Sequence, residues 1–274
     1  MSDSRRMCPN CRAFITSSDR TCPYCNERVG PRMIDVRQPG EIMGGLIPQA
    51  HFTTVLILLI NFGLFIATTW LARGMGQNEA LWALGGKFGR SIVQDHQWWR
   101  LITAGFLHGG WLHILMNSWV LYDLGAQTEQ IYSTPRFLVI YFVGTAGGFY
   151  LSLVQSPGIL SIGASAGIMG LIGAMIAFGV ANRSSMGREI RNFYLRWVAY
   201  ILVLGFMGFG NTDNWAHIGG LAAGFAVGYV AGTPVHSSRT QELLWRVLAG
   251  ICVGLTAVSF FLVYANFPGP DQLR

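Results

Sequence analysis

The stretch FLVIYFVGTAGGFYLSLVQSPGILSIGASAGIMGLIGAMIAFGVAN, residues 137–182, runs for 46 residues without a charged side chain. A helix that crosses the hydrocarbon core of a bilayer needs about 20 apolar residues, so this stretch has room for two. Its segment Gln155-Ser156-Pro157-Gly158 is polar and combines proline with glycine, which makes it the expected break. The sequence therefore predicts two consecutive transmembrane helices, at about 136–154 and 164–182.

The rest of the chain repeats this pattern. The 274 residues are 51% hydrophobic and 12% charged, and that charged share is about half that of a typical soluble domain. Charge-free stretches of suitable length predict seven membrane helices, at about 52–72, 101–124, 136–154, 164–182, 194–210, 215–232 and 244–266. We therefore predict an all-α polytopic membrane protein. The alternative, a soluble protein, would have to bury seven such segments in its core.

Basic residues in the loops predict the orientation of the chain. With seven spans, fourteen of them lie on the side of the N-terminus: Arg5, Arg6, Arg12, Arg20, Arg28, Arg32, Arg37, Arg136, Arg183, Arg188, Arg191, Arg196, Arg239 and Arg246. The opposite side has five: Arg73, Lys87, Arg90, Arg100 and Arg274. Because cytoplasmic loops carry the excess of basic residues, we expect a plasma-membrane protein with a cytoplasmic N-terminus and an external C-terminus. Arginines beside anionic lipid head groups account for the net charge of +6 without a nucleic-acid partner.

The N-terminal segment carries a separate signal. Cys8-Pro9-Asn10-Cys11 and Cys22-Pro23-Tyr24-Cys25 are two CxxC units, a spacing that suits a closed tetrahedral metal site. A segment this short cannot build a hydrophobic core, so a metal would supply its folding energy. The spacing favours structural zinc; iron and disulfides remain alternatives, although a cytosolic location disfavours disulfides. We expect a zinc-ribbon-like module at 1–30 and a Pro/Gly-rich linker at 31–50.

A serine and a histidine stand near the starts of two predicted helices, in Gly163-Ala164-Ser165-Ala166-Gly167 and Ala216-His217-Ile218-Gly219-Gly220. Titratable groups in membrane spans are rare and usually functional, and serine with histidine is the minimum set for an activated hydroxyl nucleophile. Both helices are expected to start at the outer face, which places the two residues at a similar shallow depth. Small residues recur along both helices and would let their backbones approach closely: Gly167, Gly170, Gly173 and Ala174 on the first, Gly220, Gly224, Gly228 and Gly232 on the second.

A second pair of polar residues lies in the predicted helix 101–124. His113 and Asn117 are four residues apart and so share one helical face. Both can donate hydrogen bonds from their side chains. These donors could stabilise an oxyanion, or they could only join neighbouring helices, and the residues themselves leave both readings open. The loop 73–100, with Trp82, Trp98 and Trp99, is too aromatic for disorder and is expected to form a folded element in the outer leaflet. An interfacial anchor with no further role is the alternative that the sequence leaves open.

Taken together, these motifs resemble those of the rhomboid intramembrane serine proteases. The resemblance rests on Trp99-Arg100, on the run from His108 to Asn117, on Gly163-x-Ser165, and on Ala216-His217-x-x-Gly220-xxx-Gly224. It covers the six-helix core at 51–232, and the loop and seventh transmembrane helix at 233–274 look like the extra helix of some members. The four-cysteine module lies outside the resemblance.

The resemblance implies an endopeptidase that cleaves transmembrane segments of membrane-protein substrates within the lipid bilayer. Ser165 and His217 would form a catalytic dyad, and the Ser165 backbone NH with His113 and Asn117 would hold the oxyanion. No cofactor is implied for catalysis. Ala166 and Met169 replace the glycine and tyrosine of many members, and we interpret both as variation within an active enzyme. The alternatives are a catalytically weak or inactive client-binding relative and a transporter or channel.

Overall fold

The computed structural model describes residues 5–8, 10–11, 13–16, 19–27, 52–208, 212–234 and 237–268. The chain divides into two compact units, Met1–Gln49 and Ala50–Arg274, which we describe separately. The linker predicted at 31–50 lies outside the described residues.

The first unit contains a short antiparallel hairpin. Strand β1, Arg5–Met7, pairs with β2, Phe14–Thr16. The first cysteine pair lies in the connection between them, where the amide of Cys8 donates to the carbonyl of Ala13 at 2.9 Å. The second pair lies in a turn closed by a hydrogen bond from the amide of Asn26 to the carbonyl of Cys22, also 2.9 Å.

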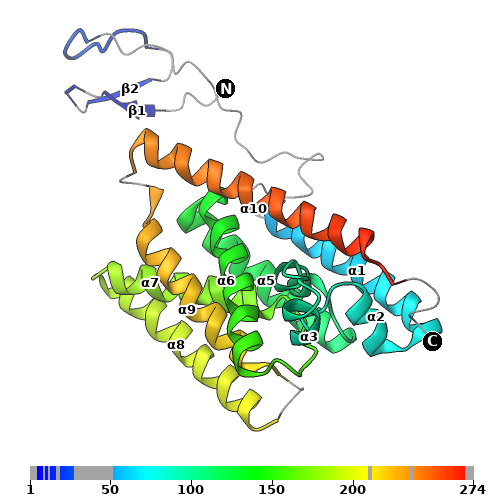
Figure 1. Cartoon of the computed structure of the whole chain (residues 1–274). Coiled ribbons are helices and arrows are strands. Elements are labelled where there is room, and N and C mark those ends of the chain that lie inside the picture. The colour runs from blue at the N-terminus through cyan, green and yellow to red at the C-terminus, as the bar shows by residue number, and fades with distance from the viewer. Residues whose placement is uncertain are drawn as a thin grey trace. The chain divides into compact units, whose positions relative to one another are not determined.

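The second unit is an all-α bundle, as predicted (Figure 1). Its described residues form seven helices of 17 or more residues: α1 (Phe52–Met75), α5 (Trp111–Tyr132), α6 (Thr134–Gln155), α7 (Ser165–Ala181), α8 (Ser185–Phe206), α9 (Asn214–Ala231) and α10 (Arg239–Ala265). By length and composition, α1, α6 and α10 could each cross a membrane, and α7 is a shorter apolar helix. The polar residues of α5, α8 and α9 lower their hydropathy, and several of these residues belong to the site described below.

Two of the predicted helices have wrong boundaries. The single helix expected at 101–124 is instead a short helical segment, α4 (Arg100–Thr103) with η2 (Ala104–Phe106), followed by α5 from Trp111. The break covers residues 107–110: Leu107 is extended, with φ −92° and ψ 150°, and so is Gly110, with φ 175° and ψ 164°, and glycine interrupts helices readily. Helix α8 begins near 185 and not near 194, because Ser184 caps it by accepting a hydrogen bond from the amide of Gly187 and the arginines that follow are good helix formers.

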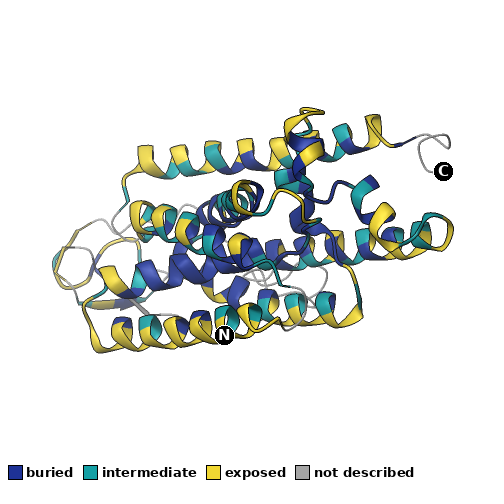
Figure 2. Ribbon diagram, turned by 60° about the horizontal axis from the view of Figure 1, so that its bottom comes forward, coloured by how far each residue is buried: buried dark blue, intermediate teal, exposed yellow. Residues whose placement is uncertain are grey.

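Helix α7 is the centre of the bundle. Nearly all of its residues are buried, and it contacts α6, α8 and α9 extensively. In Figure 2, buried residues gather on the inner helices, while the surrounding helices expose one face. The outward faces of α1 and α10 are apolar and exposed, as expected where lipid replaces water.

Helices α7 and α9 run parallel with their backbones in contact. A Cβ atom added at Gly220 would overlap the carbonyl oxygen of Ala166, and one added at Gly224 would overlap that of Gly170. A Cβ atom at Gly228 would lie 2.7 Å from the Cα atom of Ala174. The paired residues increase together along both helices, so both helices start at the same end of the bundle. Of the small residues predicted for this interface, Gly167 instead faces Tyr141 and Thr145 of α6, and Gly232 lies beyond the end of α9.

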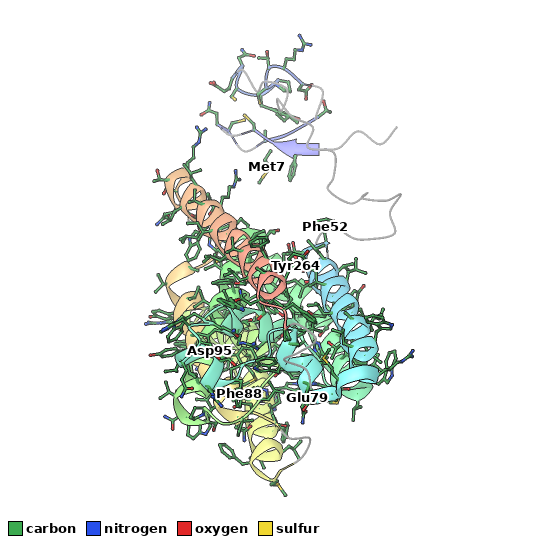
Figure 3. The ribbon with its side chains drawn as sticks, turned by 45° about the vertical axis from the view of Figure 1, so that its right-hand side comes forward. Met7, Phe52, Glu79, Phe88, Asp95 and Tyr264 are labelled. Carbon is green, nitrogen blue, oxygen red and sulfur yellow. The ribbon has the colours of Figure 1, made fainter. Side chains whose placement is uncertain are left out.

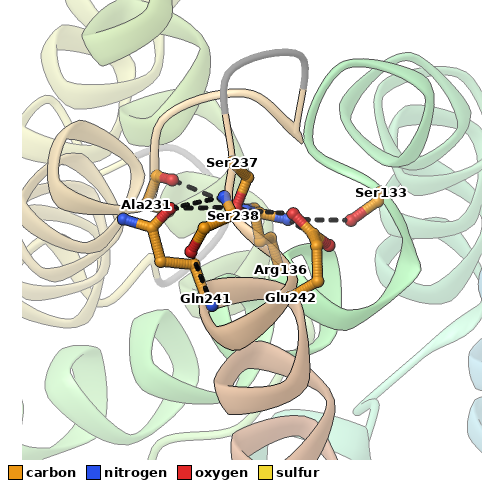
Figure 4. A network of polar contacts seen from close by, with 7 residues as sticks. All are labelled: Ser133, Arg136, Ala231, Ser237, Ser238, Gln241 and Glu242. Carbon is orange, nitrogen blue, oxygen red and sulfur yellow. Dashed lines mark hydrogen bonds and ion pairs between the residues drawn. The ribbon is translucent and has the colours of Figure 1, made fainter.

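Helix α10 contacts the rest of the bundle near both of its ends. Near its start, the buried guanidinium of Arg136 on α6 binds the carboxylate of Glu242, with an N–O distance of 2.8 Å, and the surrounding contacts appear in Figure 4. Near its end, the ring of Phe260 packs edge-on against Phe106, with centroids 5.4 Å apart. The seventh helix therefore touches both the start of α6 and the segment that precedes α5.

Candidate active site

Ser165 is the first residue of α7 and is half-buried. It follows Gly163, whose φ of 127° suits glycine and strains other residues. A Cβ atom at Gly163 would lie 2.7 Å from Nε2 of His113 and 3.6 Å from Oγ of Ser165. The His113 imidazole therefore lies against the turn that carries Ser165, so the structure brings these two predicted residues together.

His217 lies in the first turn of α9 and is buried. Because α7 and α9 are parallel and Gly220 packs on Ala166, His217 and Ser165 occupy the same end of the helix pair. Within the described residues the two side chains make no hydrogen bond to each other, and Nδ1 of His217 has no hydrogen-bond partner. Hydrogen bonds between catalytic groups are often long in unliganded enzymes and tighten only when substrate binds.

Asp213, the acidic residue nearest to His217 in the sequence, forms its hydrogen bonds with other groups. Its carboxylate caps α9 by accepting from the amide of Ala216 at 3.1 Å, and it also accepts a short hydrogen bond from the Ser152 hydroxyl. The geometry therefore gives Asp213 a helix-capping role and leaves His217 without a carboxylate partner among these contacts.

His113 and Asn117 lie on α5 and are both half-buried. The amide nitrogen of Asn117 lies 3.1 Å from Nε2 of His108, and the rings of His108 and His113 meet edge-on with centroids 5.0 Å apart. His108 is completely buried. It supports both predicted donors, a role that sequence reasoning missed, although its position at the start of the run 108–117 was a usable signal.

The loop 73–100 is folded, as expected, and contains α2 (Gln77–Ala83) and α3 (Gly89–Val93). Its buried Arg100 donates to the carbonyls of Trp82 at 2.6 Å and Gly86 at 2.9 Å, and its guanidinium lies 5.1 Å from the centroid of the Trp82 ring. The hydroxyl of Thr103 donates to the carbonyl of Gly85 at 2.7 Å. Arg100 and Thr103 therefore hold the loop against the start of α4.

The same loop pairs with the connection between α6 and α7. Lys87 and Ser161 exchange two backbone hydrogen bonds, at 3.0 and 2.9 Å, in an isolated antiparallel bridge. The amide of Gly89 donates to the carbonyl of Pro157 at 2.9 Å. The amide of Gly163 donates to the carbonyl of Ala104, also at 2.9 Å. The connection that leads to Ser165 is thus held along its length by residues from outside it.

A cavity of about 510 Å³ lies over this pairing, lined by Asn78, Glu79, Trp82, Phe88 and Leu160. Figure 3 labels Glu79 and Phe88, which come from α2 and from the residue before α3. None of these lining residues is Ser165, His217, His113 or Asn117, so the cavity is separate from the candidate site.

The four predicted cysteine ligands come together in the first unit. All four sulfur atoms lie within 4.8 Å of one another and could hold a metal ion. The Cys8–Cys25 and Cys11–Cys22 sulfur distances are 3.7 and 3.6 Å. A tetrahedron of sulfurs about 2.3 Å from zinc has edges of about 3.8 Å, so the geometry fits such a site.

Comparison with known proteins agrees with this arrangement. Residues 95–234 match the profile of the Rhomboid domain family. Over 201 residues the chain is 37% identical to "Rhomboid protease GluP" of Bacillus subtilis, covering 73% of this chain and 38% of that protein. Over 217 residues it is 29% identical to "Rhomboid-like protease 3" of Toxoplasma gondii, covering 78% of this chain and 82% of that protein. It is also 34% identical over 155 residues to "RHOMBOID-like protein 6, mitochondrial" of Arabidopsis thaliana, covering 56% and 50%. The chain thus spans less than two-fifths of the length of the Bacillus protein.

Proposed function

Because this chain belongs to the rhomboid family, we propose that it is an intramembrane serine endopeptidase with a Ser165–His217 dyad. The observation that supports this most directly is the parallel packing of α7 and α9, which puts both residues at one end of the helix pair. The protease names of two relatives support the reaction class.

The proposed reaction is acyl transfer in two steps. Nε2 of His217 accepts the proton of the Ser165 hydroxyl as Oγ attacks the scissile carbonyl carbon. The proton then passes to the leaving amine as the peptide bond breaks, which leaves an acyl group on Ser165. Water, deprotonated by the same imidazole, hydrolyses the ester and restores the serine.

We assign the oxyanion to three donors: the backbone NH of Ser165 and the side chains of His113 and Asn117. The NH lies at the start of α7, where the helix dipole favours negative charge. An asparagine amide has two N–H groups, so Asn117 can donate one to His108 and still offer the other to substrate. His108 acts through Asn117, as a positioning residue.

The substrates we propose are membrane proteins with a single transmembrane helix, cleaved near its outer end. From the distribution of basic residues we further propose a plasma-membrane location, with the N-terminus in the cytoplasm and the C-terminus outside. Catalysis is assigned to the bundle and not to the cysteine module.

A reconstituted cleavage assay tests the proposal. Wild-type protein in liposomes is expected to cleave a generic single-span substrate and to be labelled by a fluorophosphonate on a peptide that contains Ser165. Labelling should fall when substrate is added, because probe and substrate compete for one hydroxyl. A protein that binds the substrate helix but neither cleaves it nor takes the label would instead be an inactive client-binding relative. Solute flux without cleavage would favour a transporter.

For the first unit we propose a structural zinc site. Four thiolates complete a tetrahedral shell and leave no position for a substrate or water, so the metal would stabilise this small unit and take no part in peptide-bond hydrolysis. Iron suits the same ligands and is distinguished by elemental analysis.

Purified protein is expected to contain close to one zinc ion per chain, and replacing Cys8 and Cys11 with serine should remove it. Deleting residues 1–40 should leave cleavage of a simple substrate unchanged, since the dyad lies in the other unit. Elemental analysis by mass spectrometry and the cleavage assay provide the two readouts. The metal site would be contradicted if full-length protein purified without chelator held neither zinc nor iron. The serine mechanism would be contradicted if a chelator stopped cleavage by the protein that lacks residues 1–40.

A further inference from the structure

Lys87 is unusual in both sequence and structure. Of the 19 lysine and arginine residues, it is the only lysine, and its side chain is completely buried. A buried charge is unfavourable unless it is hydrogen-bonded or paired. Lys87 lies in a loop predicted to be on the external side, where no excess of basic residues is expected, so its burial calls for a local explanation.

The ammonium group binds the end of α6. Nζ donates to the carbonyl oxygens of Ser156 at 2.7 Å and Ile159 at 3.3 Å. Ser156 is the C-terminal capping residue of α6. The last carbonyls of a helix lack partners within it and carry partial negative charge, so a cation there satisfies both the hydrogen bonding and the dipole. Lys87 therefore caps α6 from a loop more than 60 residues away in the sequence.

The capped turn leads directly to the nucleophile proposed above. Ser156 to Ile159 is closed by a hydrogen bond from the Ile159 amide to the Ser156 carbonyl, at 3.3 Å. Ser161 follows and forms the backbone bridge with Lys87 itself. Gly163 then packs against the His113 ring. Lys87 thus holds the start of the segment 156–163. The end of this segment, Gly163, determines how Ser165 lies relative to His113.

We propose that Lys87 is a positioning residue for the reaction, because its ammonium group holds the turn 156–159 and thereby places Ser165 against His113. This inference rests on the proposed function. It assigns Lys87 no contact with substrate.

The expected effect is large because catalysis depends on small distances. Hydrogen bonds from a charged donor are about twice as strong as neutral ones. Replacing the ammonium removes this donor from the Ile159 carbonyl and leaves the Ser156 carbonyl with the weaker hydrogen bond from the Ile159 amide. A displacement of about 1 Å at a reacting group can lower the rate about 100-fold. Burial lowers the pKa of Lys87 to about 8, while the charge of Asp213 acts in the opposite direction, so the contacts must hold a group that burial disfavours.

The test compares three variants in liposomes. Lys87→Met keeps the length of the side chain but removes the donor, and Lys87→Arg keeps a charged donor. Arg90→Met is the matched control, since Arg90 is an exposed cation in the same loop, and its side chain bonds only to Gln94, the residue after α3, among the described contacts. Each is measured for kcat, KM, rate of fluorophosphonate labelling, Tm, and hydrogen exchange of the amides at 156–163.

Lys87→Met is expected to lower kcat and the labelling rate about 10- to 100-fold, with KM nearly unchanged and faster exchange at 156–163. Lys87→Arg should recover part of the loss, and Arg90→Met should match wild type. An active Lys87→Met protein with wild-type kcat and exchange would overturn the positioning role alone. Wild-type protein that neither cleaved nor labelled Ser165 would overturn the proposed function, and the positioning role with it.

A measurement on wild type covers the case in which Lys87→Met does not fold. Because there is one lysine, protein grown with isotope-labelled lysine gives one side-chain NMR signal. That signal should titrate near pH 8, and a nitroxide reagent in the aqueous phase should leave it unbroadened. Titration near the ordinary value of about 10.4, together with broadening by the reagent, would show a solvent-exposed side chain. That result would contradict the hydrogen bonds from Lys87 to the turn 156–159.

Discussion

Replacing Ser165 with alanine is expected to reduce cleavage to the uncatalysed background, a loss of at least about 10,000-fold in kcat, as in serine hydrolases that lose the nucleophile or base. His217→Ala should produce a loss of similar size, because neither residue can form the acyl intermediate alone. The double variant should be no worse than either single one, since residues that act as a unit are not additive. Cleavage kinetics in liposomes provide the measurement, with Tm as the check on folding.

Two controls make this result specific. Ser118→Ala removes a hydroxyl from α5 that is buried and has no partner in the described part of the chain. His96→Asn changes an exposed loop histidine with φ of 55° to a residue that tolerates this conformation. Both should retain wild-type kcat. Turnover by Ser165→Ala at the wild-type rate would refute the dyad.

The next largest effect is expected at the oxyanion donors. Asn117→Ala and His113→Ala should each lower kcat about 100- to 1,000-fold with little change in KM, because these donors act on charge that develops in the transition state. Asn117→Ala also removes the hydrogen bond to His108, so its Tm should fall as well. The split between kcat and KM is the decisive readout.

His108 provides the comparison that separates chemistry from packing. His108→Gln keeps a polar side chain beside Asn117 and is expected to lose less activity than Asn117→Ala. If Asn117→Ala and His113→Ala kept full kcat and lowered only Tm, these residues would be interhelical hydrogen-bonding groups, the other reading that the sequence leaves open.

The sequence predicted the helices well where the signal was local. Charge-free stretches identified α1, α6, α7, α9 and α10 to within a few residues at most ends, because each must present apolar side chains to lipid or to its neighbours. The boundary at 101–124 was wrong because hydropathy averages over residues 107–110, where the interruption is a change of backbone conformation and not of hydrophobicity. The start of α8 was missed because its arginines read equally well as a loop.

The sequence likewise identified some residues of the candidate site and missed others. Ser165, His217, His113 and Asn117 stood out because each is a polar residue in an apolar surrounding. Lys87 did not, because its function depends on a turn at 156–159 that no periodic pattern connects to residue 87. Its one available signal was composition, as a lone lysine among arginines.

The fixed register between α7 and α9 limits which changes of chain length this protein can tolerate. Each residue of an α-helix turns its successors by about 100°. One residue inserted between Ser165 and Gly170 would therefore rotate the serine away from the contacts that the rest of α7 makes through Gly170 and Ala174. Length variation among proteins built on this plan should therefore be absent from the first two turns of α7 and α9.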